Sequence, residues 1–319
     1  MRTGFSLVWF KSGGAAEWLF EPRDIDDLQQ FLRDLDPAIA VWPLGLGSNL
    51  IIRDGGIRGV VIRLGKAFSG NEADGLPLCC GAGAPGISAA SKARDHGIAG
   101  MEFLRGIPGT IGGAVRMNAG AYGREVCDIL QSADVILRNG DLVTIPLAEM
   151  GYSYRHSALP EGAIVVGATF KGEAGDPAII GAEMKRIGDE REASQPLRSK
   201  TGGSTFKNPD GHKAWQLVDE AGCRGLQIGQ AQVSEKHCNF LMGGWSAERE
   251  VSLSSGNGVA DALEKNGHKV SRVDMDRNVA QILTGLRPDV VFNALHGVPG
   301  EDGSVQGMLD LMQIPYTHS

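Results

Sequence analysis

The sequence predicts an α+β protein of two or three domains rather than a single doubly wound sheet. Its 319 residues exceed what one hydrophobic core normally holds. Short strands predominate over residues 1–175. Over residues 242–319 the predicted strands alternate with helices, which is the pattern of a chain that forms a parallel sheet. Hydrophobic residues make up 42% and charged residues 22% of the chain, which is typical of a globular protein.

The elements of the first part follow from local patterns. Asp24 is a suitable N-cap for a helix, because apolar residues recur behind it at helical spacing. Residues 139 and 140, Asn-Gly, predict a β-hairpin between residues 134–138 and 142–145. A helix begins near Pro85 and ends before Gly97. Strands are predicted at residues 5–14, 40–53 with a glycine interruption, 59–64, 78–81 and 163–170.

The predicted pattern of strands and helices changes near residue 240. A helix rich in charge is predicted at residues 177–193, and a short helix is predicted at residues 213–221. Residues 238–242 could form the first strand of a new unit, in which a long helix ends at Gly267. Alternating elements then follow: strands at 269–274 and 289–295, and helices at 279–286 and 304–312.

Composition excludes several classes of protein. The net charge of −7 argues against general nucleic-acid binding. There is no apolar run of about 18 residues that would indicate a membrane span. The five cysteines form no C-x-x-C pair, and the seven histidines are scattered, so we expect reduced thiols, a cytoplasmic protein and no bound metal. We also expect a monomer.

Two glycine-rich stretches predict a ligand site. Residues 105–123 contain six glycines in nineteen positions, and residues 45–49 read Gly-Leu-Gly-Ser-Asn. Bends rich in glycine bring backbone N–H groups close to a ligand, and successive amides suit a phosphate or pyrophosphate. For residues 105–123 the alternative is a glycine-rich surface loop without a ligand.

Five motifs in one order carry a family resemblance. They are GLGSN (45–49), RDGG (53–56), GIPGTIGGAVRMNAGAYG (106–123), YRHS (154–157) and GGSTFKNP (202–209). Over residues 7–241 the chain closely resembles the UDP-N-acetylenolpyruvoylglucosamine reductase family, in its shorter subclass. Residues 242–256 and 294–319 instead resemble the N-terminal domain of D-Ala-D-Ala ligase, so the resemblance predicts that two truncated enzymes of one pathway are joined in this chain.

The resemblance implies a three-part architecture. Residues 1–175 would form an FAD-binding domain with the two-subdomain α+β fold of the vanillyl-alcohol-oxidase type. Residues 176–241 would be a truncated α+β substrate domain, and residues 242–319 a Rossmann-like α/β unit. The implied cofactors are FAD and NADPH. The residues that would hold FAD are Gly45, Gly47, Ser48, Asn49, Gly106, Ile107, Pro108, Gly109, Thr110, Gly112, Gly113, Ala114 and Asn118.

The resemblance also assigns the chemistry. Arg155 would stabilise the enolate and carboxylate charge that develops on hydride addition, and Ser204 would protonate the neighbouring carbon. Tyr154, Lys207 and Asn208 would contact the substrate, and the last two are also the local candidates to assist Ser204. The alternatives are a structural Arg155 on the surface and a Ser204 that only forms a turn.

The implied activity is NADPH-dependent reduction of UDP-N-acetylglucosamine enolpyruvate to UDP-N-acetylmuramate in peptidoglycan precursor synthesis, with a UDP-sugar as the small-molecule partner. The family's C-terminal segment carries a catalytic glutamate, and this chain has the ligase-like sequence there. Glu248 and Glu250 belong to that sequence and are not assigned the role. The competing hypothesis is an FAD-binding but catalytically impaired fusion.

Overall fold

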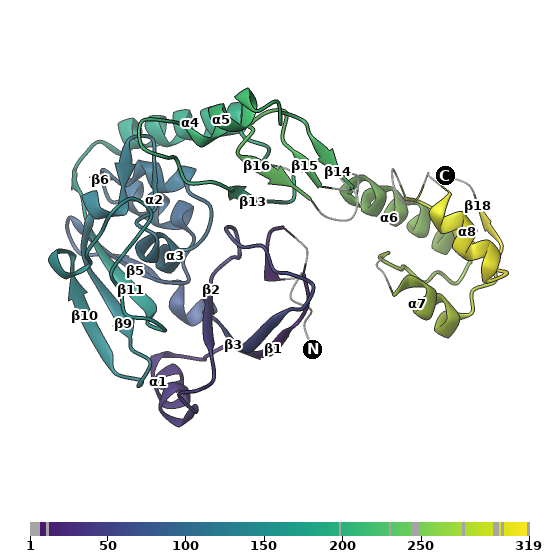
Figure 1. Cartoon of the computed structure of the whole chain (residues 1–319), viewed down its shortest axis with the longest axis horizontal. Helices are drawn as coiled ribbons and strands as arrows, with labels where there is room; N and C mark the ends of the chain where they lie inside the picture. Colours follow the sequence, from purple (N-terminus) through teal and green to yellow (C-terminus); the bar gives the residue numbers. More distant parts are fainter. Residues whose placement is uncertain are drawn as a thin grey trace. The chain divides into compact units, whose positions relative to one another are not determined.

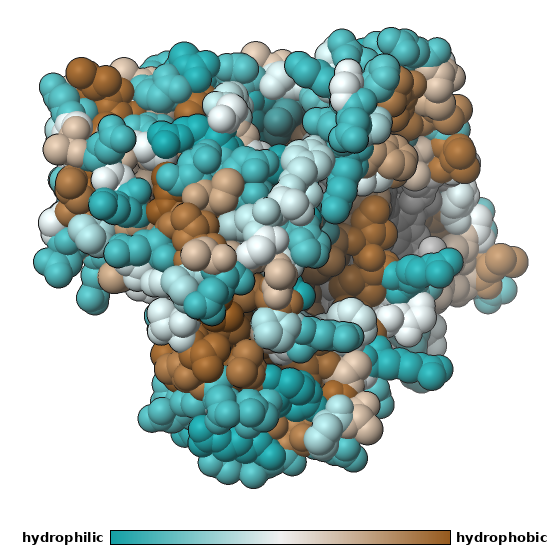
Figure 2. Space-filling view, turned by 60° about the vertical axis from the view of Figure 1, so that its left-hand side comes forward, coloured by the Kyte–Doolittle hydropathy of each residue, from teal (hydrophilic) through white to brown (hydrophobic). Residues whose placement is uncertain are grey.

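The computed structural model describes residues 7–10, 13–197, 199–229, 231–243, 249–275, 278–295, 300 and 303–317. The chain divides into two compact units, Met1–Met242 and Gly243–Ser319 (Figure 1). Each unit has its own buried core. Figure 2 shows a mainly hydrophilic face on which hydrophobic side chains gather in separate patches. No helix among the described residues combines the length and apolar character needed to cross a membrane.

The first unit begins with a small parallel sheet of order β1-β3-β2. Asp24 caps the following helix as expected, since its side chain accepts the backbone N–H of Asp27 at 2.8 Å. That helix buries Leu28 and Leu32 against β3 and against two strands of the next sheet. The elements are β1 (Ala16–Phe20), α1 (Ile25–Asp34), β2 (Val41–Leu44) and β3 (Ile57–Arg63).

A five-stranded antiparallel sheet of order β10-β9-β11-β5-β4 forms the largest core, together with α2 and α3. The predicted hairpin is confirmed, because β9 and β10 pair with Ile136 opposite Leu142 and Gly140 takes a φ of +85° in the turn. The elements are β4 (Asn71–Ala73), β5 (Pro77–Gly81), α2 (Gly86–Asp95), β6 (Ile98–Ala99), α3 (Ile111–Arg116), β7 (Gly120–Ala121), β8 (Arg124–Glu125), β9 (Leu130–Ile136), β10 (Leu142–Pro146), β11 (Ile164–Lys171) and β12 (Glu173–Ala174).

The rest of the first unit is the charged helix α4 and a four-stranded antiparallel sheet of order β13-β16-β15-β14. Strand β16 lies between β13 and β15, so residues 240–242 are an interior strand of this sheet. They do not form the first strand of the second unit, as the sequence had predicted. The elements are α4 (Pro177–Ser194), β13 (Thr201–Ser204), α5 (Ala214–Glu220), β14 (Gln227–Ile228), β15 (Ala231–Val233) and β16 (Phe240–Met242).

The second unit contains three helices and one parallel strand pair among its described residues. Leu283 and Leu309 pack together in its core. The strand expected at residues 269–274 is not formed, and Arg272 there pairs with Asp261 and Glu264 of α6, each at 2.8 Å. The elements are α6 (Arg249–Lys265), α7 (Val279–Leu286), β17 (Val291–Phe292), α8 (Ser304–Leu311) and β18 (Tyr316–Thr317).

Candidate active site

The two predicted glycine loops lie against each other. A Cβ atom built on Gly45 would be 2.4 Å from the Thr110 Oγ1, and one built on Gly109 would be 2.8 Å from the Ser48 Oγ. Gly109 also has a φ of +113°, a conformation that side chains rarely adopt. Contact between these loops therefore requires glycine at both positions, whether or not a ligand is bound.

A cleft of about 620 Å³ opens beside these loops. It is bounded by β2, by the first turn of α3 and by the start of β11. Four of the predicted cofactor residues line it, namely Gly45, Thr110, Gly112 and Gly113. Beside the loops the wall is glycine backbone and Thr110, which lets an extended ligand approach the main chain, and larger side chains such as Trp42 and Arg138 line other parts of the cleft.

Not every amide in the second loop is free for a ligand. The N–H of Ile111 donates to the Ala84 carbonyl at 2.9 Å, and that of Gly112 donates to the Ala82 carbonyl at 2.8 Å. Gly106 has a packing role as well, because a Cβ there would lie 2.4 Å from the Tyr122 ring. Part of the glycine content therefore serves packing within the fold.

Arg155 is held in place from several sides. Its Nη2 donates to the Gly120 carbonyl at 2.7 Å, and its Nη1 donates to the Asn118 carbonyl at 3.3 Å and to Glu125 Oε1 at 3.0 Å. The guanidinium also lies over the Tyr154 ring, 4.8 Å from its centre. These contacts fix the position of the guanidinium, as a structural arginine also requires, so the catalytic role of Arg155 stays a prediction.

The motif that contains Ser204, residues 202–209, lies near residues 45–49 at one end and near residues 154–157 at the other. Gly203, in β13, lies so that an added Cβ would be 3.7 Å from the Ser48 carbonyl oxygen. Lys207 Nζ donates to the Arg155 carbonyl at 3.5 Å. Ser204 therefore lies in a segment between the first glycine loop and Arg155, and within the described residues its hydroxyl has no hydrogen-bond partner.

The substrate residues proposed from the sequence are also brought together. The N–H of Asn208 donates to the Tyr154 hydroxyl at 3.3 Å. The side chain of Asn208 has a structural task, because its Oδ1 accepts the N–H of Ala214 at the start of α5, at 2.9 Å. Lys207 is exposed, so its ammonium group has room to meet an anion.

Asn118 has no side-chain hydrogen-bonding group left for a cofactor. It is 1% exposed. Its Oδ1 accepts the N–H of Cys127 at 2.9 Å, and its Nδ2 donates to Glu125 Oε2 at 2.8 Å and to the Ser153 carbonyl at 3.2 Å. The role of Asn118 as a flavin contact stays a prediction. Its amide links the segments that contain Glu125, Cys127 and Ser153.

Glu125 is the site residue that sequence reasoning missed. It joins Arg155 and Asn118, and it forms a capping box with Asp128 at the 3₁₀ turn Val126–Asp128. The Glu-x-x-Asp spacing could have indicated the cap. Nothing in the sequence pattern links Glu125 to an arginine that lies thirty positions later.

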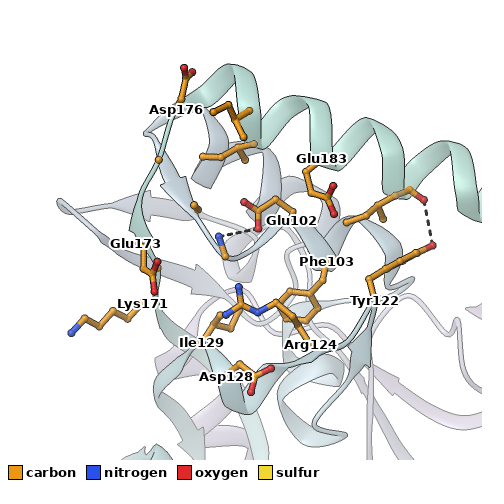
Figure 3. A pocket seen from close by; sticks show the side chains of 17 residues that line it. Glu102, Phe103, Tyr122, Arg124, Asp128, Ile129, Lys171, Glu173, Asp176 and Glu183 are labelled. Atoms are coloured by element: carbon orange, nitrogen blue, oxygen red, sulfur yellow. Dashed lines mark hydrogen bonds between the residues drawn. The ribbon is translucent and has the colours of Figure 1, made fainter.

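A larger cavity, of about 700 Å³, lies elsewhere in the first unit and contains none of the predicted site residues (Figure 3). Within it the Tyr122 hydroxyl donates to the Ile187 carbonyl at 3.3 Å. Burial, aided by the charge of Glu190, raises the pKa of Tyr122. The carboxylates that line this cavity are Glu102, Asp128, Glu173, Asp176 and Glu183. The smaller cleft is the one that coincides with the glycine loops.

Comparison with known proteins places this chain in a family. The UDP-N-acetylenolpyruvoylglucosamine reductase of Sphingopyxis alaskensis is 64% identical over 273 residues, 85% of this chain and 88% of the relative. That of Rhizorhabdus wittichii is 65% identical over 261 residues, 82% of this chain and 85% of the relative. This chain belongs to the UDP-N-acetylenolpyruvoylglucosamine reductase family. The resemblance drawn from the five motifs is confirmed.

Family models and a solved structure agree with this reductase assignment. An FAD binding domain matches residues 16–146, the C-terminal domain of UDP-N-acetylenolpyruvoylglucosamine reductase matches 195–255, and the D-ala D-ala ligase N-terminus matches 283–319. The crystal structure of the Thermus caldophilus reductase superimposes with a TM-score of 0.69 at 32% identity, over 83% of this chain and 94% of that one. The predicted fold class is confirmed.

The reductase likeness continues beyond residue 241. The match to the reductase C-terminal domain ends at residue 255, inside α6. The alignment to the Sphingopyxis relative covers 273 residues and so extends into the second unit, which begins at Gly243. Of the two glutamates noted there, Glu248 lies outside the described residues, as does the side chain of Glu250.

Proposed function

We propose that this chain reduces UDP-N-acetylglucosamine enolpyruvate to UDP-N-acetylmuramate, with NADPH as the reductant and FAD as the bound cofactor. The observation that carries the proposal is the identity of 64% to a named reductase over 85% of the chain. The alternative of a catalytically impaired flavin-binding fusion is not favoured, because the likeness spans both the FAD model and the reductase C-terminal model.

The residues present fit FAD. The cleft of about 620 Å³ is lined by the two glycine loops, where added Cβ atoms would fill the space or collide. We assign FAD binding to the thirteen residues named from the sequence, with Asn118 acting through its backbone and its support of the loop. When bound, FAD supplies the hydride chemistry that no protein side chain can provide.

The chain's own residues then handle charge and protons. Hydride addition to the enolpyruvyl double bond leaves negative charge on an enolate joined to a carboxylate, and the planar guanidinium of Arg155 suits that group. Ser204 is assigned the proton that the neighbouring carbon needs, and Lys207, three residues along the same motif, is assigned to favour its alkoxide form. Tyr154 and Asn208 would hold the sugar nucleotide.

We also propose the domain limits and the setting. Residues 1–175 are assigned to FAD binding, 176–241 to the substrate, and 242–319 to the ligase-like unit. The five cysteines are free thiols and NADPH and nucleotide sugars are cytoplasmic metabolites, so we assign the protein to the cytoplasm. A monomer remains our prediction, which light scattering of the purified protein tests.

Steady-state turnover tests the proposed function. The purified protein is expected to be yellow and to oxidise NADPH only when UDP-N-acetylglucosamine enolpyruvate is added, giving a product with two more hydrogen atoms by mass spectrometry. A colourless protein that takes up no added FAD, or NADPH oxidation that ignores the enolpyruvyl substrate, would contradict the proposal.

A further inference from the structure

Glu125 makes the link between Arg155 and the buried loop below it. Its Oε1 accepts Arg155 Nη1 at 3.0 Å, and its Oε2 accepts Asn118 Nδ2 at 2.8 Å. Its carboxylate also accepts the backbone N–H of Asp128 in the capping box, and its own N–H donates to Asp128 Oδ2 at 2.8 Å. Both carboxylate oxygens are therefore fixed by donors from different segments.

The contacts of Arg155 leave one part of its guanidinium open. Of the five N–H groups, both on Nη1 and one on Nη2 are used by Glu125, the Asn118 carbonyl and the Gly120 carbonyl. Within the described chain, the Nε–H and the second Nη2 hydrogen have no protein acceptor. Nε and Nη2 are the neighbouring donors that bind a carboxylate in the two-pronged manner.

The backbone around this link is held in uncommon conformations. Asn118, Tyr122 and Arg155 have φ values of +41°, +54° and +55°, and they are three of the five such non-glycine residues in the described chain. A Cβ at Gly120 would lie 2.7 Å from the Glu125 Cγ. Such conformations persist only where surrounding contacts enforce them, and they concentrate at functional sites.

We propose that Glu125 is a positioning residue of the reductase. Its carboxylate holds the guanidinium of Arg155 so that the open Nε and Nη2 donors face the carboxylate of the enolpyruvyl group, and Asn118 in turn fixes Glu125. This inference rests on the proposed function, and Glu125 itself contacts neither substrate nor cofactor. Its effect is confined to the step in which the enolpyruvyl group takes up hydride.

The variant Glu125→Gln breaks the link with little change of shape. In the carboxamide one of the two acceptor oxygens becomes an NH2 donor, so when the remaining oxygen accepts from Asn118, the NH2 group faces the Nη1 donor of Arg155. Asn118 cannot turn its amide to compensate, because its Oδ1 already accepts the N–H of Cys127 at 2.9 Å. The guanidinium then loses a charged partner, and small misplacements of a reacting group cost about 10- to 100-fold in rate.

Stopped-flow absorbance of the flavin separates the two half-reactions of the full-length holoprotein. For Glu125→Gln we expect flavin content and the rate of flavin reduction by NADPH to stay within about twofold of wild type, and reoxidation by the enolpyruvyl substrate to slow about 10- to 100-fold. Glu102→Gln is the matched control, since Glu102 also accepts a backbone N–H, from Gly100 at 2.9 Å, and it is expected to match wild type in both steps.

A double-variant cycle distinguishes positioning from a general structural role. If Glu125 acts through Arg155, the variant carrying both Glu125→Gln and Arg155→Lys reoxidises no more slowly than Arg155→Lys alone. Two results would overturn the proposal. One is that Glu125→Gln slows both half-reactions equally, and the other is that the double variant slows reoxidation by the product of the two single-variant effects. If Glu125→Gln does not fold, Glu125→Asp keeps the charge, shortens the reach and is expected to slow reoxidation selectively.

The two proposals fail in different ways. Wild-type flavin that NADPH reduces but the enolpyruvyl substrate does not reoxidise counts against the proposed function. Wild-type reoxidation that Glu125→Gln and Glu125→Asp leave unchanged counts against the role of Glu125 alone.

Discussion

The variant Gly109→Ala should loosen the contact between the two glycine loops. At this position φ is +113°, and the new Cβ would lie 2.8 Å from the Ser48 Oγ. Forcing a side chain into such a backbone conformation costs about 1–3 kcal/mol. Inserting a methyl group into a filled space costs about 1–3 kcal/mol more. If about 2 kcal/mol of this total is expressed as lost flavin affinity, the Kd for FAD rises about 30-fold.

Fluorescence quenching of FAD titrated with apoprotein measures this effect. Gly55→Ala is the control, because an added Cβ there meets nothing within 4 Å, and it is expected to bind FAD as wild type does. Wild-type affinity in Gly109→Ala would refute the reasoning that these loops form the cofactor site.

Three further predictions concern separate parts of the chain. Ser204→Ala should slow reoxidation of reduced flavin by the substrate about 10²- to 10⁴-fold while NADPH still reduces the flavin, which stopped-flow absorbance checks. Leu309→Ala, at a fully buried position, should destabilise the second unit by about 2–5 kcal/mol and leave FAD binding unchanged, which calorimetry with and without FAD checks. Burial lowers the pKa of His237, so unfolding free energy should fall as pH drops below the ordinary histidine value of about 6.5, and His237→Phe should flatten that slope in urea titrations at several pH values.

Local signals predicted most helices of this chain well, but not α3 (Ile111–Arg116), which lies inside the stretch expected to be a glycine-rich loop. Helix α7 (Val279–Leu286) has the predicted limits, and α4 (Pro177–Ser194) differs by one residue. In both cases the apolar spacing and the terminal residues, such as the Asp176 cap of α4, act within a few positions of one another. These features need no knowledge of distant partners.

Strands were harder to predict because their partners lie far away in sequence. The described part of residues 5–14 forms no strand, since the N–H of Trp9 donates to the Gly47 carbonyl at 3.1 Å and this segment packs on the glycine loop. The parallel pairing of β3 with both β1 and β2 was also not expected. Pairing choices of this kind are settled by the whole fold rather than by a local pattern.

For the candidate site, residue types in the sequence predicted the glycine loops but not the side chains, such as Glu125, that hold Arg155 in place. Glycine content predicted a phosphate-binding loop at each of residues 45–49 and 105–123, and the family resemblance assigned both to FAD; Gly45 and Thr110 do lie together. Asn118 was predicted as a cofactor contact, whereas its side chain is used entirely by the protein. The role of Glu125 depends on a three-dimensional contact with Arg155 that no spacing rule encodes.

Anaerobic flavin absorbance of the purified holoprotein tests the central claim most directly. NADPH alone should bleach the yellow flavin, and one equivalent of UDP-N-acetylglucosamine enolpyruvate should then restore the oxidised spectrum with formation of UDP-N-acetylmuramate. Flavin that stays bleached after the substrate is added, while air restores its colour, would contradict the assignment of this chain as an active reductase.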